Sequence, residues 1–433
     1  MPLAFLPTFC PLRQRAADLT LTEKGLEHWR IRRCATATEL DAAWPEARRK
    51  DDFWVSKKVL RFLADRPQGI ETEAIILEDS RDFSRVLLTA QTFTFSAAGQ
   101  VSDAAKGTTS TYDFRRRLLA PFSFKVLCLG QFLTSGPFSA DGLGQLSAPV
   151  AARLLPAVAD LLMQRCRGYA GVLIKDLYPR EHPATSALEN NGFHPMPVDP
   201  VMTLDIPADW RNMDDYLAAL TSKYRVRYRR ARGKLEGITR CRLTADEVDR
   251  KRENIYALYQ QVSSGADFNA ASVRAGYFPW LARVRKPVPT LETMLTGNGY
   301  GGGVAGATEW SNNTPVFTGY FNEAEELIGF TTAIPNGEVL HAHYLGMEDA
   351  YKFSHHLYHN MLFDLAETAI DGNFASLDYG RTALEIKSSV GAVARDHAVL
   401  ARARYGWLNR LIPLFTPAVY KAPEWVARNP FRV

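Results

Sequence analysis

Long apolar runs are missing from this chain. No stretch of about 18 residues, the length that a membrane-spanning helix needs, is free of polar side chains. The five cysteines are scattered, odd in number and without a CxxC pair, which excludes a disulfide framework and a zinc ribbon. The apolar start of the chain has no basic residue before it and is interrupted by prolines, unlike a secretory signal peptide. We therefore expect a cytoplasmic protein with reduced cysteines.

A strong imbalance of charge is absent as well. The formal net charge is +5 over 433 residues, so the overall charge gives no indication of a nucleic-acid partner, and we expect none. Hydrophobic residues make up 46% of the chain and charged residues 23%, a globular balance that argues against disordered and fibrous classes. A chain of this length exceeds one ordinary core and is typical of two domains.

Strands and helices alternate in the first half of the chain. Strands are predicted at Thr72–Leu77, Val86–Phe95, Lys125–Leu133 and Gly171–Asp176, and the apolar segment Ala148–Gln164 between the last two predicts a helix. This order of elements predicts a mixed sheet.

The same order returns in the second half. A helix is predicted over Phe353–Ala369, where an apolar stripe recurs at four-residue spacing. Strands are predicted at Val316–Tyr320, Leu327–Ala333, Val339–Leu345, Phe374–Tyr379 and Ala398–Ala403. We expect an irregular leader over 1–30, a first domain over 31–208, a basic helical connector over 209–235, and a second, catalytic domain over 236–433 with an amphipathic tail.

Two separated motifs resemble the Fem-type double-GNAT transferases. One runs from Asn191-Gly192-Phe193 through three nearby prolines to the basic segment Asp214–Lys234, and the other is Leu377–Ala392. The resemblance covers residues 30–405. It implies an α/β fold of two GNAT-like halves, each a mixed sheet flanked by helices. It also implies transfer of an acyl or aminoacyl group from a thioester or tRNA ester to an amine.

One feature of many coenzyme A-binding GNAT enzymes has no counterpart after the strand Val339–Leu345. This is the R/Q-x-x-G-x-G/A loop, whose place is taken by GMEDAYKFSH. In the first half, Gly142 and Gly144 lie between a strand and a helix, without the preceding arginine or glutamine. These glycines form either a donor site or a plain tight loop. We expect acyl-CoA as a cosubstrate and no tightly bound cofactor.

The strand Val339–Leu345 carries candidate acid–base groups. Acyl transfer to an amine needs a base, stabilisation of an oxyanion and a proton for the leaving group. Strand alternation places His341 and His343 on one face and Ala342 with Tyr344 on the other. A histidine of near-neutral pKa could take the proton of the amine, and Tyr344 could donate one. The alternative is a pair of histidines that make structural hydrogen bonds.

The motif Leu377–Ala392 places a second group of candidates at the end of a strand. Asp378 and Tyr379 end that strand, and Thr382 is expected to begin a helix whose N–H groups favour an anion. Thr382 and Glu385 match a T-x-x-E capping box, which predicts a structural role for Glu385.

Two cations follow in the same motif. The resemblance implies that Lys387 lies near the substrate and the reacting groups. Arg381 could pair with a phosphate, and the alternative for both cations is a salt bridge to Asp378 or Glu385. Our candidate catalytic residues are therefore His341, His343, Tyr344, Asp378 and Lys387. Our candidate substrate- and donor-binding residues are Tyr379, Arg381, Thr382, Arg227, Arg229, Arg230, Gly142 and Gly144.

Histidines also cluster farther along the second half. His355 and His359 are spaced as a pair of metal ligands, but no third ligand lies nearby in the sequence, and we expect no metal.

Basic residues concentrate in the connector, where seven of the twelve residues of Lys223–Lys234 are cationic. They fit nucleotide phosphates, anionic lipid, tRNA or only solvent. The tail Arg404–Arg428 mixes aromatic and cationic residues. It fits either a segment lying on the inner membrane or a tail packed on the second domain.

Three functions compete at this stage. The first is transfer of a long-chain acyl group from acyl-CoA to an amine on a lipid-like acceptor such as a sphingoid base, as in bacterial ceramide synthases of the GNAT type. The second is Fem-type aminoacyl transfer from aminoacyl-tRNA to a peptidoglycan precursor. The third is a non-catalytic GNAT-like binding module. The basic connector and the aromatic tail favour the first.

Overall fold

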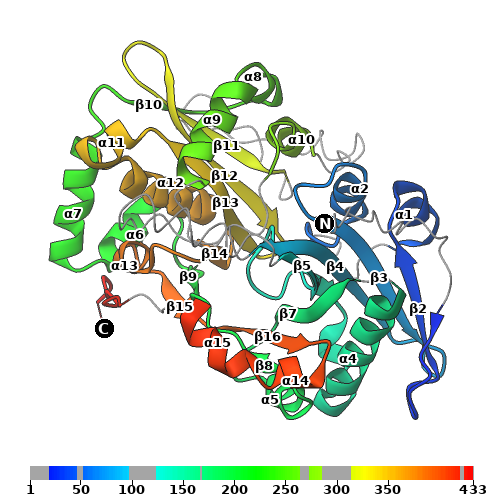
Figure 1. Ribbon diagram of the computed structural model, residues 1–433. Helices are drawn as coiled ribbons and strands as arrows, with labels where there is room; N and C mark the ends of the chain where they lie inside the picture. The colour runs from blue at the N-terminus through cyan, green and yellow to red at the C-terminus, as the bar shows by residue number, and fades with distance from the viewer. Residues whose placement is uncertain are drawn as a thin grey trace, which may run out of the picture.

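Two mixed β-sheets, each flanked by helices, form the protein (Figure 1). The computed structural model describes residues 19–45, 52–96, 123–165, 168–263, 273–284, 314–419 and 424–432. Within these ranges the two sheets have nine and seven strands. The prediction of an α/β fold built from two similar halves is confirmed.

The first sheet has the strand order β1-β2-β3-β4-β5-β7-β16-β8, with β6 paired to β4. Its strands are β1 (Leu19–Thr20), β2 (Trp29–Cys34), β3 (Glu71–Asp79), β4 (Arg85–Ser96), β5 (Ser123–Leu129), β6 (Ala140–Asp141), β7 (Tyr169–Pro179), β8 (His194–Pro195) and β16 (His397–Ala403). The flanking helices are α1 (Ala37–Ala43), α2 (Lys57–Asp65), α4 (Ala148–Arg165) and α5 (Pro183–Asn190). A short 3-10 turn, η3, covers Leu143–Gln145.

The second sheet has the order β10-β11-β12-β13-β14-β9-β15. Its strands are β9 (Val201–Asp205), β10 (Thr239–Arg242), β11 (Val316–Phe321), β12 (Leu327–Asn336), β13 (Val339–Met347), β14 (Ser376–Asp378) and β15 (Val393–Arg395). The remaining helices are α6 (Met213–Ala219), α7 (Ser222–Gly233), α8 (Ala245–Arg250), α9 (Arg252–Ser263), α10 (Tyr277–Arg283), α11 (Asp349–Ser354), α12 (Leu357–Asp371), α13 (Leu384–Ser389), α14 (Gly406–Asn409) and α15 (Ile412–Val419).

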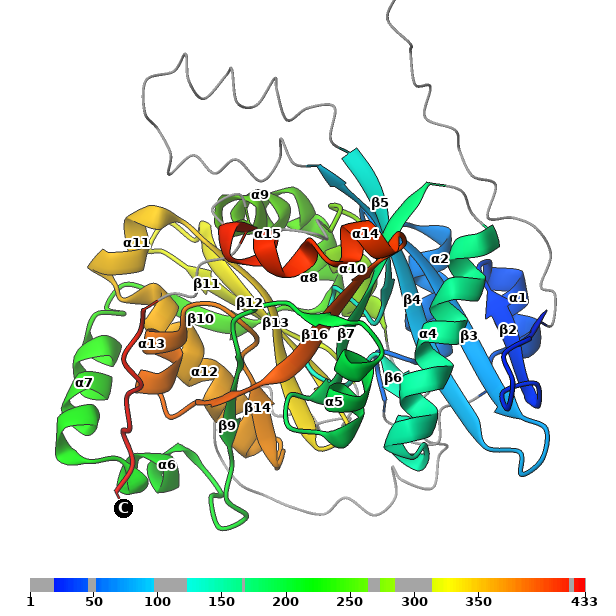
Figure 2. The same cartoon turned by 60° about the horizontal axis from the view of Figure 1, so that its bottom comes forward.

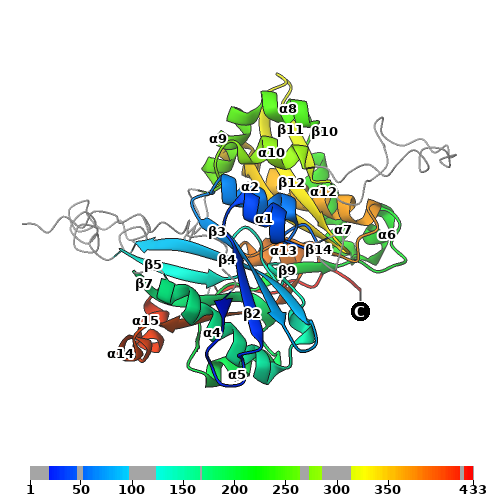
Figure 3. The ribbon, with the colours of Figure 1, turned by 90° about the vertical axis from the view of Figure 1, so that its right-hand side faces the viewer.

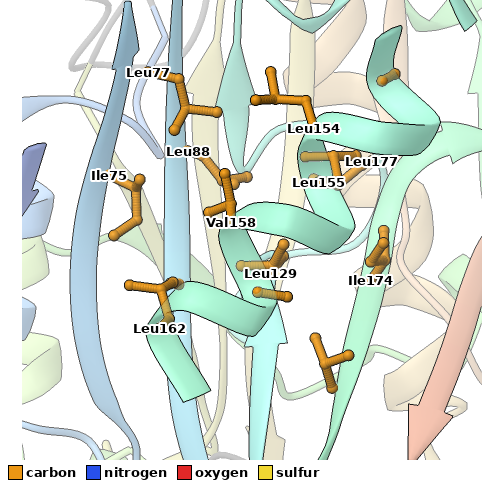
Figure 4. Packing of buried hydrophobic residues seen from close by; sticks show 14 of the residues in the cluster. Ile75, Leu77, Leu88, Leu129, Leu154, Leu155, Val158, Leu162, Ile174 and Leu177 are labelled. Carbon is orange, nitrogen blue, oxygen red and sulfur yellow. The ribbon is translucent and has the colours of Figure 1, made fainter. Parts of the chain in front are cut away.

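The long helix α4 covers one face of the first sheet. Its apolar residues Leu154, Leu155, Val158 and Leu162 lie over side chains of β3, β4, β5 and β7 (Figure 4). Burial of this stripe removes several large side chains from water, at about 1.5–3 kcal/mol each. The predicted apolar helix between two strands is thus the main support of the first sheet.

The two sheets exchange strands across the expected division after residue 208. Strand β9 comes before that division but pairs with β14 and β15 of the second sheet. Strand β16 comes from the end of the chain but pairs with β7 and β8 of the first sheet. The expectation that Ala398–Ala403 closes the second sheet is therefore wrong. After β15, at the edge of the second sheet, the chain crosses to the first sheet, where β16 lies between β7 and β8.

Apolar residues of both halves also share one core. Trp54 and Phe62 of the first half belong to the same buried cluster as Tyr277 and Phe330 of the second. The rings of Phe62 and Trp280 stack with their centroids 3.7 Å apart, which joins α2 to α10. Figure 3 shows α2 and α10 next to each other where the two halves meet.

The predicted connector helices form α6 and α7, and both pack on α12. Arg232 of α7 contacts the Asp364 carboxylate at 2.5 Å. The exposed residues of α7 include Arg227, Arg229 and Arg230. Among the described helices, none has the length and apolar character needed to cross a bilayer.

Candidate active site

The two parallel strands β13 and β14 diverge at a histidine and a carboxylate. Their pairing ends at His341 opposite Asp378. Strand β14 stops there, whereas β13 continues to Met347. Ligands of α/β sheets bind at such carboxyl ends of parallel strands. His341 and Asp378 therefore lie at the opening of the sheet.

A β-bulge turns part of β13 toward the same face. The register with β12 shifts between Thr331 and Ala333, and both backbone groups of Tyr344 hydrogen bond to the Thr332 hydroxyl. The extra residue brings the rings of His343 and Tyr344 together, with centroids 4.1 Å apart. The predicted opposite orientation of Tyr344 is therefore wrong, because a bulge interrupts strict alternation.

His341 is buried between aromatic rings and the carboxylate. Its ring lies 4.4 Å from that of Phe138 and 6.2 Å from that of Trp54, centroid to centroid. Its Nδ1 is 3.6 Å from Asp378 Oδ2, and its buried Nε2 has no partner among the described residues. Burial lowers the pKa of His341 to about 3, so the imidazole is neutral at pH 7, contrary to the expected near-neutral pKa.

His343 has a different partner. Its Nε2 is 2.7 Å from the Tyr277 hydroxyl. Burial, with a smaller effect of His341, lowers the pKa of His343 to about 3, whereas burial raises the pKa of Tyr277 well above its ordinary value. The Tyr344 hydroxyl is likewise buried, and its pKa is raised by burial and by Tyr259. His343, Tyr277 and Tyr344 therefore form an aromatic cluster with an internal hydrogen bond between His343 and Tyr277.

Asp378 and Lys387 are connected through the loop between them. The Gly380 N–H donates to Asp378 Oδ1 at 2.6 Å. Lys387 Nζ donates to the carbonyls of Gly380 at 3.2 Å and Arg381 at 2.6 Å. Burial raises the pKa of Asp378 to about 6 and lowers the pKa of Lys387 to about 7. Both groups therefore change charge near neutral pH, and strongly shifted groups of this kind are typical of functional sites.

The capping box predicted after this loop does not form. Gly380, Thr382 and Ala383 all have positive φ angles. The helix α13 begins at Leu384 and has no side-chain cap, and Glu385 pairs with Arg428. The three left-handed residues turn the chain so sharply that the Thr382 hydroxyl does not cap the helix, and Thr382 is exposed.

Arg381 crosses to the first half. Its Nη1 and Nη2 donate to the two Asp176 carboxylate oxygens at 2.8 and 2.6 Å, and its Nε donates to the Asp199 carbonyl at 2.7 Å. Lys175 Nζ also contacts Asp176, at 2.6 Å. Burial alone would raise the pKa of Asp176, but Lys175 and Arg381 hold it well below its ordinary range. The alternative interpretation of Arg381, a salt bridge, holds with a different partner, because Arg381 pairs with Asp176 of the first half and not with Asp378 or Glu385.

The structure places the other candidates away from this group. The Tyr379 hydroxyl donates to the Leu362 carbonyl inside the core. Gly142 has a positive φ, and a Cβ there would collide with the Arg85 carbonyl, so its glycine is needed for the chain path. Gly144 lies in η3. Arg227, Arg229 and Arg230 lie on α7 (Figure 1).

Trp54, Lys175 and Asp176 were missed by reading the sequence. The only signal is the charged pair Lys175-Asp176 at the end of the predicted strand Gly171–Asp176, because charges rarely end a buried strand without a partner. Trp54 has a buried Nε1 without a partner among the described residues. In the sequence, however, nothing distinguishes this tryptophan from an ordinary core residue. No group of three metal-ligating side chains occurs within the described ranges.

Comparison with known proteins finds similarity in solved structures. No protein-family model matches the chain, and no curated protein sequence matches it. A crystal structure of FemX has a TM-score of 0.44 and 10% identity, with 80% of this chain and 90% of that chain covered. The structure of L-PGS from Bacillus licheniformis has a TM-score of 0.42 and 11% identity, covering 84% and 91%. A GCN5-related N-acetyltransferase from Kribbella flavida has a TM-score of 0.35 and 10% identity, covering 66% and 84%.

Proposed function

We propose that the protein is an N-acyltransferase that moves an acyl group from a thioester to an amine, with Asp378 and His341 as the proton-accepting pair. The observation that carries this proposal is the placement of His341. One ring nitrogen faces the Asp378 carboxylate, and the other is buried without a partner among the described residues. A histidine beside a carboxylate, with its other nitrogen unpaired, has the components of a general base, and binding of substrate would bring the reacting amine to that nitrogen.

The proposed reaction needs one proton acceptor and one proton donor. The amine nitrogen attacks the thioester carbonyl, the C–N bond forms, and the C–S bond then breaks. His341 Nε2 takes the proton of the attacking amine, and Asp378 stabilises the imidazolium that results. Because its pKa is about 7, Lys387 can hold the proton that the leaving thiolate needs. Trp54 Nε1, an N–H donor beside His341, would stabilise the oxyanion.

A long-chain acyl group and a lipid-like amine suit the surroundings of this pair. Aromatic rings of Trp54 and Phe138 flank His341, and apolar walls favour an apolar substrate. Acyl-CoA is the proposed donor, and a sphingoid base, as in ceramide synthesis, is the proposed type of acceptor. The acceptor would come from an anionic membrane.

The proposed membrane contact is the segment of α14 and α15. Tyr405, Trp407 and Leu414 are 55%, 67% and 72% exposed, and Arg404 and Arg410 lie among them, also exposed. No acidic residue occurs between 404 and 419. Exposed aromatics and cations together fit the interface of an anionic membrane.

Helix α7 is not part of this surface. The views of Figures 1, 2 and 3 all place it apart from α14 and α15. The end of the tail follows the alternative of packing on the second half. Phe431 pairs with Leu220 and packs against Trp210 and Tyr216.

The test is thiol release from acyl-CoA donors of increasing chain length, combined with a panel of amines that includes a sphingoid base. We expect release that depends on both partners, and a loss of about 10²-fold or more in kcat for His341→Asn and Asp378→Asn. The matched control is His28→Asn, which removes another histidine near an aspartate, with His28 Nε2 3.3 Å from Asp79. It should keep wild-type turnover.

Three outcomes would contradict the proposal. Amide formation only from aminoacyl-tRNA would favour the Fem-type alternative. Tight binding of a donor without turnover of any amine would favour the non-catalytic module. Full activity of both His341→Asn and Asp378→Asn would remove this pair from the reaction.

A further inference from the structure

We infer that Asp176, a residue of the first half, positions the reacting groups of the second half by holding Arg381 and the loop that Arg381 belongs to. The inference rests on the proposed function, in which Asp378, His341 and Lys387 react. It goes beyond that function because it assigns to a residue of the first half a role in positioning the reacting groups of the second half.

The contact between the halves is a two-point ion pair. Both terminal nitrogens of Arg381 bind the two oxygens of Asp176. The Asp176 side chain is 1% exposed and that of Arg381 is 16% exposed. A planar guanidinium held at two points has a fixed orientation, which a single contact does not give. The backbone of Arg381 is therefore held in place relative to β7.

The backbone held in this way carries the hydrogen bonds of the site. The Arg381 carbonyl and the Gly380 carbonyl both accept from Lys387 Nζ, and the Gly380 N–H donates to Asp378. Beyond the Arg381 side chain, which Asp176 holds at two points, the path continues through backbone groups to the side chains of Asp378 and Lys387. A shift of Arg381 would thus move both Asp378 and Lys387.

The position of Asp176 is itself unusual. It has a φ of 60° within β7. A left-handed conformation of a residue other than glycine is strained and persists where surrounding contacts require it. Here the contacts are those to Arg381 and Lys175, which supports a role for the orientation of this carboxylate.

The first half has an opening that corresponds to the one in the second half. Strands β5 and β7 are parallel and separate after Leu129 and Ile174, as β13 and β14 separate after His341 and Asp378. At the opening in the first half, Lys175 Nζ donates to the Gln131 and Thr134 carbonyls. That opening is filled by the protein's own chain, and its carboxylate, Asp176, faces the second half.

Two variants separate positioning from general stability. Asp176→Asn removes the charge and weakens the hold on Arg381, whereas Arg381→Lys keeps the charge and removes the two-point contact. The matched control is Glu73→Gln, which breaks a buried two-point pair with Arg33 in the first half. We expect kcat to fall about tenfold or more in both test variants with little change in KM, and to stay at the wild-type value in the control.

The pH profile supplies a readout that a loss of folded protein would not move. The charged groups that face Asp378 are Lys387, Arg381 and Asp176, with His341 beside it. Burial raises the pKa of Asp378, whereas Lys387 and Arg381 lower it, and the charge of Asp176 raises it by a smaller amount. While Arg381 stays near Asp378, Asp176→Asn should therefore move the acid limb of kcat to lower pH. NMR titration of the Asp378 carboxyl carbon, assigned with Asp378→Asn, should show the same shift without any need for turnover.

The outcomes distinguish this inference from the proposed function. Wild-type kcat and an unmoved Asp378 titration in Asp176→Asn would overturn the inference and leave the proposed function standing. A wild-type protein inactive with every donor and amine would overturn the proposed function, and the NMR titration would still decide whether Asp176 acts on Asp378. Equal losses in Glu73→Gln and Asp176→Asn would reduce the role of Asp176 to folding.

Discussion

The carboxylate of Asp378 and the amine of Lys387 lie on either side of one loop, and burial moves their pKa values toward each other. A buried carboxyl favours its neutral form, so its pKa rises, and a buried amine favours its neutral form, so its pKa falls. Each effect opposes ionisation, but each leaves a group that changes its charge near neutral pH. This pair of shifts determines how activity should depend on pH.

We predict a narrow bell-shaped pH profile for kcat. The proton acceptor requires ionised Asp378, so activity should fall as the pH drops below about 6. The leaving group requires protonated Lys387, so activity should fall as the pH rises above about 7. Steady-state kinetics from pH 5 to about 9 would show both limbs. In Lys387→Met the alkaline limb should disappear, and its persistence would assign that limb to another group.

The exposed Thr382 allows a second prediction at this scale. It does not cap α13, so Thr382→Ala should change the free energy of unfolding by less than about 0.5 kcal/mol. Thr244 is the cap of a complete capping box in α8, and Thr244→Ala should cost about 1 kcal/mol. Urea unfolding of both variants makes the comparison. An equal loss in the two would mean that Thr382 supports the loop by another contact.

How far these residues could be predicted depends on sequence distance. Asp378 and Lys387 lie within one short motif, and His341 lies on the neighbouring predicted strand, so a site containing them could be proposed from the sequence. The contact of Arg381 with Asp176 joins positions 205 residues apart, and no local pattern predicts such a pair. The orientation of Tyr344 depends on a bulge in the pairing of β12 with β13, and the alternation of residues along a strand does not predict where a bulge occurs.

At the scale of elements, α14 and α15 are short helices that leave large apolar side chains in solvent. Both follow β16 and contact that strand. Asn409 anchors the segment through hydrogen bonds to the Gly192 carbonyl and the Ala403 N–H. The anchored side faces the first sheet, and the exposed side carries Trp407 and Leu414. Exposed apolar residues in a cluster indicate a surface that meets another apolar phase.

We predict that this segment binds anionic vesicles. Each basic residue near such a membrane contributes about 1 kcal/mol to binding. Reversing Arg404 and Arg410 to Glu should therefore weaken vesicle binding by an order of magnitude or more. Trp407→Ser should weaken vesicle binding at every salt concentration. Cosedimentation with vesicles of phosphatidylglycerol, against vesicles of phosphatidylcholine, measures both effects.

The control for this prediction is α7. Reversal of Arg227, Arg229 and Arg230 to Glu changes more charge than the Arg404 and Arg410 variant, but on a surface apart from α14 and α15 (Figure 2). It should leave vesicle binding largely intact. If the α7 variant alone lost binding, the membrane surface would be α7, and equal binding to both kinds of vesicle would contradict an electrostatic contact.

At the scale of the whole molecule, the exchange of β9 and β16 makes each half depend on the other. The order of strands and helices within each half could be predicted from periodicity and turn residues. The exchange could not, because β9 and β16 have the same pattern whichever sheet they join. The side of a strand that is buried can be predicted from its alternation, but its partner is set by the fold as a whole.

We predict that the chain cannot be divided at residue 208 into two stable proteins. Residues 1–208 would lack β16, and residues 209–433 would lack β9. Each piece alone should be aggregated or partly folded, and the two pieces expressed together should form a soluble complex. Size-exclusion chromatography and circular dichroism provide the measurement. The control is a cut of the same kind in an exposed surface turn, after Glu323. Two independently folded pieces from the cut at residue 208 would contradict the prediction.

The late position of β16 in the chain has a consequence for synthesis in the cell. This strand lies between β7 and β8, so the first sheet has an open edge on β7 until residues 397–403 have left the ribosome. An open strand edge is a template for pairing with other chains, and the nascent first half needs protection while the second half is translated. A premature stop codon after residue 395 would spare every group of the proposed reaction and still leave that edge uncovered. Such a truncated protein should be removed by aggregation or proteolysis.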